Sequence, residues 1–154
     1  MDIIKLIICL VICQIAGLLG AVFNIKSIPR WYSKLKKPRF NPPNWIFGPV
    51  WTILYFLMGI SVYLVLVSGK ETTSAVLIFF IQLVLNVLWS ALFFGIKKPS
   101  FAFIEIILLE ISILVTIALF YKISIIASYL LIPYFLWVGF ASILNFSIWR
   151  LNKS

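Results

Sequence analysis

Hydrophobic residues dominate the sequence, and charged residues divide it into five long apolar segments. The segments cover residues 6–25, 40–69, 72–96, 99–121 and 123–149. Each is long enough for the roughly 20 apolar residues with which a helix crosses the hydrocarbon of a bilayer, and a helix satisfies its own backbone hydrogen bonds in lipid. Pro133 interrupts the last segment and predicts a kink near Tyr129. The pattern predicts an all-α integral membrane bundle of five transmembrane helices, in one domain over residues 1–154.

The composition excludes an ordinary soluble domain. Only 11% of the residues are charged, whereas a soluble domain carries about 25%, so this chain cannot cover a water-facing surface. The net charge of +9 would also suit a nucleic-acid partner, but the basic residues lie between apolar segments and no soluble domain carries them. We therefore expect contact with membrane lipid, whose anionic headgroups attract basic connections, and no nucleic-acid partner.

The basic residues are spread unevenly over the connections. Six lie between the first and second segments, two follow the third and two lie in the C-terminal tail, against three on the opposite side. The positive-inside rule then places the N-terminus outside and the C-terminus in the cytoplasm, and the many isoleucines and lysines fit a prokaryotic cell membrane.

The first apolar segment could instead be a signal peptide. Its uncharged run is longer than the roughly 7–15 residues of a signal core. Its small residues also recur at the spacing that lets helices approach closely, Ala16 with Gly20 and Gly17 with Ala21. These features favour a retained helix.

The connection between the first two segments is long, basic and rich in proline. Four prolines restrict its backbone: Pro29, Pro38, Pro42 and Pro43. Long ordered loops in compact proteins are often lids or binding loops. Its aromatic residues Trp31 and Tyr32 could simply anchor the loop among lipid headgroups, but the prolines favour a lid over a pocket between the helices.

Aromatic and amide side chains recur at helical spacing in three of the expected helices. Trp51 and Tyr55 lie in the second, Gln82, Asn86, Trp89 and Phe93 in the third, and Tyr134, Trp137, Ala141 and Asn145 in the fifth. An amide facing lipid would leave hydrogen bonds unmade, so these stripes should face inward. They could act as interhelical hydrogen bonds or as ligand contacts. If the stripes converge, they form an aromatic cavity with a few polar groups, which suits a flat hydrophobic ligand.

Few residues suit metal or acid–base chemistry. The sequence has no histidine, and Cys9 and Cys13 are best interpreted as apolar fillers within the first segment. Glu105 and Glu110 are five positions apart and do not share a helix face, and no acidic residue in another expected helix could complete a proton relay with them. We expect no metal site and no required cofactor.

Three stretches together resemble the TspO/MBR family of tryptophan-rich sensory proteins, whose animal members are translocator proteins, also called peripheral benzodiazepine receptors. The stretches are WYSKLKKPRFNPPNWIFGPVWTILYFLMG at 31–59, QLVLNVLWSALFFG at 82–95 and PYFLWVGFASILNFSIWR at 133–150. The resemblance implies a five-helix bundle, commonly a homodimer, that binds a porphyrin such as protoporphyrin IX or haem. It implies a ligand site formed by Trp31, Tyr32, Trp51, Tyr55, Asn86, Trp89, Trp137 and Ala141.

The resemblance leaves three functions open. The first is a membrane receptor or sensor for a tetrapyrrole. The second is light- and oxygen-dependent porphyrin breakdown, for which the family pattern points to Trp51 and Trp137 as tentative catalytic residues. The third is a transporter of porphyrin or of a lipid such as a sterol, although five helices show no obvious inverted repeat. Phe146 replaces the tyrosine of the animal cholesterol motif, which weakens the case for a sterol.

Overall fold

The structure is a computed structural model and describes residues 1–153. Five spans are long and apolar enough to cross a membrane, and the described residues contain no strand. The helical elements are α1 (Ile3–Ser27), η1 (Tyr32–Lys34), η2 (Asn44–Ile46), α2 (Phe47–Leu66), α3 (Thr73–Ser90), η3 (Ala91–Gly95), α4 (Pro99–Ile123), α5 (Ile125–Leu130) and α6 (Ile132–Leu151). The predicted five-helix membrane bundle is therefore confirmed.

Local sequence signals set several of the helix ends. Asp2 caps α1 by accepting a hydrogen bond from the backbone N–H of Lys5, and Ser124 caps α5 in the same way through Ala127. The last span breaks at Leu131, between α5 and α6, because Pro133 cannot continue the hydrogen-bond ladder of the preceding turn. The break lies two residues from the predicted kink at Tyr129.

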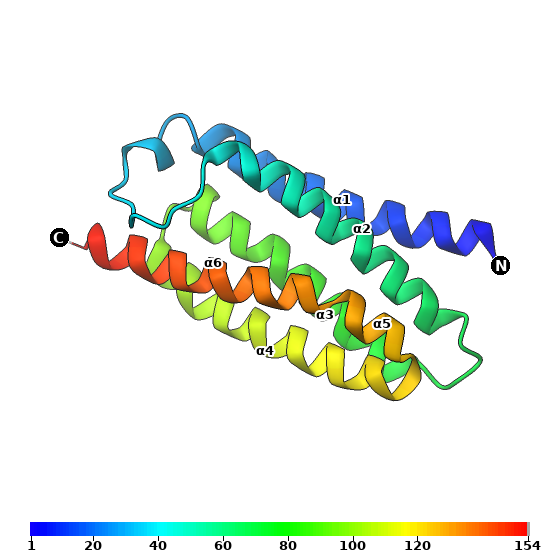
Figure 1. The fold of residues 1–154 in the computed structure, drawn as a ribbon. Coiled ribbons are helices and arrows are strands. Elements are labelled where there is room, and N and C mark those ends of the chain that lie inside the picture. The colour runs from blue at the N-terminus through cyan, green and yellow to red at the C-terminus, as the bar shows by residue number, and fades with distance from the viewer. Residues whose placement is uncertain (154) are drawn as a thin grey trace.

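The five spans run side by side along one axis, and the two termini lie at opposite ends of the bundle (Figure 1). α1 packs against α2 and α3, α3 against α4, and α4 against α6. Small residues allow the closest approach: a Cβ on Gly17 would lie 2.6 Å from the ring of Tyr55, and one on Gly59 would lie 2.9 Å from the Cα of Leu10. α1 is thus packed as a member of the bundle, and Gly17 is one of the small residues that the sequence singled out.

The connection between α1 and α2 folds over one end of the bundle, beside the C-terminus of α6 (Figure 1). Tyr32 is 2% exposed, and its hydroxyl donates a 2.8 Å hydrogen bond to Oδ1 of Asn41. Asn152, just after α6, binds the loop backbone twice, at the N–H of Lys36 (3.0 Å) and at its carbonyl (2.9 Å). Phe40 packs edge-on against Phe140 of α6. These contacts hold the loop against the helices in one conformation.

Both acidic residues of α4 lie within the span. Glu105 is 5% exposed, and neither of its carboxylate oxygens has a hydrogen-bond partner among the described residues. Glu110 is half-buried, with Oε1 3.2 Å from where a Cβ on Gly139 of α6 would lie. The absence of a side chain at Gly139 therefore makes room for this carboxylate between α4 and α6.

Candidate functional site

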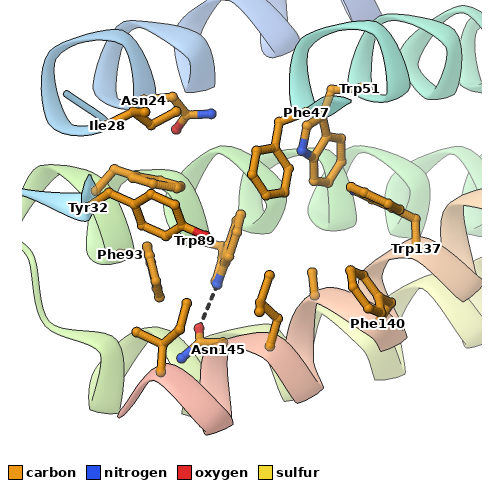
Figure 2. Close-up of a pocket in the computed structure, with 14 residues that line it drawn as sticks. Asn24, Ile28, Tyr32, Phe47, Trp51, Trp89, Phe93, Trp137, Phe140 and Asn145 are labelled. Atoms are coloured by element: carbon orange, nitrogen blue, oxygen red, sulfur yellow. Dashed lines mark hydrogen bonds between the residues drawn. The ribbon is translucent and has the colours of Figure 1, made fainter. Parts of the chain in front are cut away.

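An aromatic pocket lies between α1, α2, η3 and α6, at the end of the bundle that the loop covers (Figure 2). Figure 2 shows Phe47 and Trp51 entering from α2, Trp137 and Phe140 from α6, and Trp89 from α3. The lining comprises Asn24, Ile28, Tyr32, Phe47, Trp51, Trp89, Phe93, Phe94, Trp137, Phe140, Ala141, Leu144, Asn145 and Ile148.

The π-helical turn η3 places two neighbouring aromatic rings on the pocket. Phe93 and Phe94 are adjacent in sequence, yet both are buried and both line the cavity, with their ring centroids 4.8 Å apart. The turn follows directly on α3 and ends at Gly95. This turn gives one wall of the pocket two rings from one stretch of backbone.

The tryptophans are oriented by specific contacts. Trp89 donates its indole N–H to Oδ1 of Asn145 at 2.9 Å, and the Asn145 amide donates in turn to the carbonyl of Pro99 at 2.8 Å. Across the pocket, the rings of Trp51 and Trp137 meet edge to face with centroids 6.5 Å apart. This edge-to-face arrangement is one that ring quadrupoles favour, and it places two indoles side by side on one wall.

A hydrogen-bonded network lies deeper in the bundle than the pocket. The Tyr55 hydroxyl donates to Oδ1 of Asn86, and the Asn86 amide donates to the Tyr134 hydroxyl at 2.7 Å. Tyr134 donates in turn to Oε1 of Gln82 at 2.6 Å. All four residues are buried, and they join α2, α3 and α6. The amides of Asn86 and Gln82 therefore form hydrogen bonds between helices beneath the aromatic pocket.

Two polar atoms on the pocket lining have no hydrogen-bond partner among the described residues. They are Oδ1 of Asn24, an acceptor on α1, and Nε1 of Trp137, a donor on α6, and both atoms are buried. A buried polar group without a partner costs about 1–3 kcal/mol. A bound molecule carrying a donor and an acceptor would remove both costs.

Tyr32 brings a polar group of the loop to the pocket. Burial raises the pKa of its phenol to about 12, and the hydrogen bond to Asn41 opposes this shift. At neutral pH the hydroxyl is therefore protonated, and it donates a hydrogen bond to Oδ1 of Asn41. Nζ of Lys37 lies 4.8 Å from the centre of the Tyr32 ring, which places a positive charge over the loop side of the site.

The pocket is nearly closed. Its free volume is about 30 Å³, which is room for a water molecule or two. A second cavity of about 300 Å³ lies between α1 and α2, lined by residues that include Gln14, Gly17, Thr52 and Tyr55. Asn24, Ile28, Phe47 and Trp51 line both cavities. Ligand sites typically have about 300–1,000 Å³, so the aromatic pocket can hold a drug-sized ligand only if it joins the second cavity, and Phe47 and Trp51 line both spaces.

The structure brings five of the eight predicted site residues onto the pocket lining: Tyr32, Trp51, Trp89, Trp137 and Ala141. Tyr55 lines the neighbouring cavity, and Asn86 lies in the buried network. Trp31 lies behind the lining, with its ring edge-on to Phe93 at 5.6 Å. The role of each in ligand binding stays a prediction. As for metals, the described residues contain no group of three or more histidines, cysteines, aspartates or glutamates that could hold an ion.

Several lining residues were not predicted. Phe93 and Asn145 belong to the predicted stripes, but the others do not: Asn24, Ile28, Phe47, Phe94, Phe140, Leu144 and Ile148. Asn24 could have been predicted from the sequence, because it is an amide inside an otherwise apolar span and should therefore face inward. Ile28 lies four positions later, on the same helix face. The remaining residues are apolar side chains in apolar helices, where the sequence does not distinguish a pocket wall from a lipid face.

Comparison with known proteins agrees with this architecture. The family model described as "TspO/MBR family" matches residues 9–150. The chain is 46% identical to the "Tryptophan-rich protein TspO" of Archaeoglobus fulgidus, over 99% of both chains. It is 39% identical to the "Translocator protein" of Homo sapiens, over 80% of this chain and 75% of that protein. It is 37% identical to the "Tryptophan-rich sensory protein" of Cereibacter sphaeroides, over 79% and 77%. This five-helix, multi-pass membrane protein therefore belongs to the TspO/MBR family.

Proposed function

We propose that the protein is a membrane receptor or sensor that binds a flat hydrophobic ligand, most simply a tetrapyrrole such as protoporphyrin IX or haem, in the aromatic pocket. The observation that carries this proposal is the pair of unpartnered polar atoms, Oδ1 of Asn24 and Nε1 of Trp137, on a lining that is otherwise mostly aromatic. Such a lining favours a planar ligand through stacking and edge contacts. The names of the relatives, sensory protein and translocator protein, fit a receptor in a membrane.

The polar groups of the site match those of a porphyrin. Oδ1 of Asn24 would accept a hydrogen bond from a pyrrole N–H or a protonated carboxyl group, and Nε1 of Trp137 would donate to a carboxylate oxygen. The loop carries basic residues close to the pocket, such as Lys37 above Tyr32. The carboxylate edge of the macrocycle would therefore face the loop, and its apolar edge would face the bundle.

Binding requires the pocket to open. Phe47 and Trp51 line both the closed pocket and the cavity between α1 and α2, so rotation of these two side chains would join the two spaces. The ligand would enter from the side of the bundle through this cavity, and the loop would stay in place. The loop contacts of Asn152 with Lys36 would then persist in the complex.

The proposal is tested by titrating protoporphyrin IX into detergent-purified protein and following the quenching of tryptophan fluorescence. Trp137→Phe removes the N–H donor and keeps an aromatic ring, and Asn24→Leu removes the acceptor. Trp137→Phe should raise Kd by about tenfold or more, since a hydrogen bond to a charged group contributes about 1.5–3 kcal/mol. Asn24→Leu should raise it by about twofold to tenfold, since a hydrogen bond between uncharged groups contributes about 0.5–1.5 kcal/mol. Trp45→Phe is the matched control, because Trp45 is 73% exposed and lies outside the pocket. Quenching that does not saturate, or an equal loss in the control, would refute the proposal.

A second candidate function is light- and oxygen-dependent oxidation of the bound porphyrin. The observation that favours it is the pair of indoles, Trp51 and Trp137, in edge contact on the pocket lining. Illumination of the complex in air should then bleach the porphyrin absorption beyond a free-porphyrin control, and Trp51→Phe should abolish the excess. Equal bleaching in wild type and variant would leave the receptor function alone.

We further propose that the loop end of the bundle faces the cytoplasm. The termini lie at opposite ends (Figure 1), and most basic residues of the connections lie at the loop end. A single cysteine introduced at exposed Lys36, in a variant with Cys9 and Cys13 replaced by alanine, should resist a membrane-impermeant maleimide added to intact cells. One introduced at Lys70 should react. The reverse labelling pattern would invert the topology.

A further inference from the structure

A second groove opens on the loop end of the bundle, between the end of α1 and the turn from η3 to α4. Its volume is about 560 Å³, and it is lined by Phe23, Lys26, Ser27, Arg30, Ala91, Phe94, Gly95, Ile96 and Lys97. Only Phe94 also lines the aromatic pocket. We propose that this groove binds the phosphodiester headgroup of an anionic phospholipid, with the first part of an acyl chain along its apolar wall.

The groove concentrates positive charge without a counterion. Lys26 and Arg30 come from the α1 side and Lys97 from the turn before α4, and all three are exposed. No acidic residue lines it, and among the described residues the one ion pair joins Lys5 to Asp2, near the N-terminus. The carbonyl ends of α1 and η3 carry only partial negative charge, which three full positive charges outweigh. The groove therefore attracts an anion.

Ser27 supplies a buried hydroxyl on the groove lining. Its side chain is 3% exposed, and its Oγ has no hydrogen-bond partner among the described residues. Helical hydroxyls elsewhere in the chain bond to the carbonyl four positions earlier, as Thr52 does at 2.8 Å and Ser147 at 2.9 Å. The Ser27 hydroxyl does not make this bond, so it remains able to donate to a phosphate oxygen.

Lys97 adopts a backbone conformation that suits glycine better than lysine. Its φ of 63° is in the left-handed region, which is unfavourable for a residue with a Cβ. The turn is fixed by hydrogen bonds from the N–H of Ile96 to the carbonyl of Ala91 (2.7 Å) and from the N–H of Lys98 to that of Leu92 (3.1 Å). A strained residue that persists in a well-determined turn often has a functional role. Here the residue with the unfavourable backbone conformation is Lys97, whose side chain brings an ammonium group to the groove lining.

The apolar wall distinguishes a lipid from a soluble phosphate. Ile96 is 58% exposed, and Phe23 packs so closely on Gly95 that a Cβ there would lie 2.9 Å from its ring. These apolar side chains share the groove with the three cations, at the end of a membrane-spanning bundle. A phospholipid presents its phosphate and acyl chain in the same arrangement, at the boundary between headgroups and hydrocarbon.

The test is native mass spectrometry of the intact purified protein with phosphatidylglycerol or phosphatidylcholine added at equal concentration. Wild type should bind phosphatidylglycerol in preference to phosphatidylcholine. Arg30→Gln and Lys97→Gly should each reduce this preference by about fivefold, the effect of one cation near an anionic headgroup. Ser27→Ala should reduce it without any change in net charge. Lys36→Gln is the matched control, since Lys36 is exposed on the loop and lies outside the groove.

Lys97→Gly also separates binding from folding. Glycine relieves the left-handed backbone, so the melting temperature of this variant in detergent should equal or exceed that of wild type while its lipid preference falls. An equal loss in Lys36→Gln would show general surface attraction and overturn the proposal. No lipid preference in wild type, or displacement of phosphatidylglycerol by inorganic phosphate at equal concentration, would overturn it as well.

Discussion

Replacing Asn86 with leucine tests whether the buried amides hold the helices together or contact the ligand. Asn86 accepts a hydrogen bond from the Tyr55 hydroxyl and donates one to the Tyr134 hydroxyl. It is 2% exposed and does not line the aromatic pocket. Leucine keeps a similar volume and removes both bonds. Tyr134 retains its bond to Gln82, whereas the Tyr55 hydroxyl loses its acceptor.

The cost follows from these partners. An interhelical hydrogen bond in a membrane contributes about 0.6–2 kcal/mol, and two are lost. The buried Tyr55 hydroxyl, left without an acceptor, adds about 1–3 kcal/mol. We therefore expect Asn86→Leu to lower the free energy of unfolding by about 2–7 kcal/mol in total. Porphyrin affinity should fall less than in Trp137→Leu, because Trp137 is on the pocket lining and Asn86 is not.

A double-mutant cycle with Tyr55→Phe measures the bond between the two residues. Tyr55→Phe removes the hydroxyl, so the double variant no longer contains an unpartnered donor. Its loss of unfolding free energy, measured by denaturant titration in mixed micelles, should be smaller than the sum of the single losses by about 1 kcal/mol. Agreement with the sum to within about 0.3–0.5 kcal/mol would show independent sites, and the network described here would be refuted.

Three further substitutions give independent checks. Gly17→Val places side-chain atoms where a Cβ would already lie 2.6 Å from the Tyr55 ring, so thermal unfolding in detergent should show a loss of about 1–3 kcal/mol from overpacking. Glu105→Leu removes a buried, unpartnered carboxyl group, and the same assay should show a gain of about 1–3 kcal/mol; a loss would reveal a partner for the carboxyl group. Ala141→Leu fills the small free volume of the pocket, so fluorescence titration should show porphyrin affinity reduced about tenfold or more, and unchanged affinity would place the ligand elsewhere.

The sequence predicted the spans well because charge and hydropathy decide them directly. The expected segment 99–121 corresponds to α4, Pro99–Ile123, and the expected segment 72–96 corresponds to α3 with η3, Thr73–Gly95. The amides also predicted which helix faces point inward, because an amide that faces lipid leaves its hydrogen bonds unmade. Asn86 and Asn145 both lie inside the bundle, and in each the amide oxygen and the amide nitrogen both form a hydrogen bond to a neighbouring helix.

The rest of the site could not be predicted from patterns of polarity. Phe140 lines the pocket and Phe101 is exposed on the outside of the bundle, yet both are phenylalanines in uniformly apolar helices. Because lipid tails are as apolar as a protein core, the outward face of a membrane helix is not marked by polar residues. The π turn at η3 and the near closure of the pocket depend on packing between side chains of several helices. Neither leaves a signal in the spacing of any one segment.

The most direct measurement is a structure of the protein with protoporphyrin IX bound. The macrocycle should lie against the wall formed by Trp51 and Trp137, with a hydrogen bond to Oδ1 of Asn24 and with Phe47 rotated so that the pocket and the cavity between α1 and α2 are continuous. A porphyrin bound on the outside of the bundle, with the aromatic pocket closed and Asn24 still unpartnered, would contradict the proposed site.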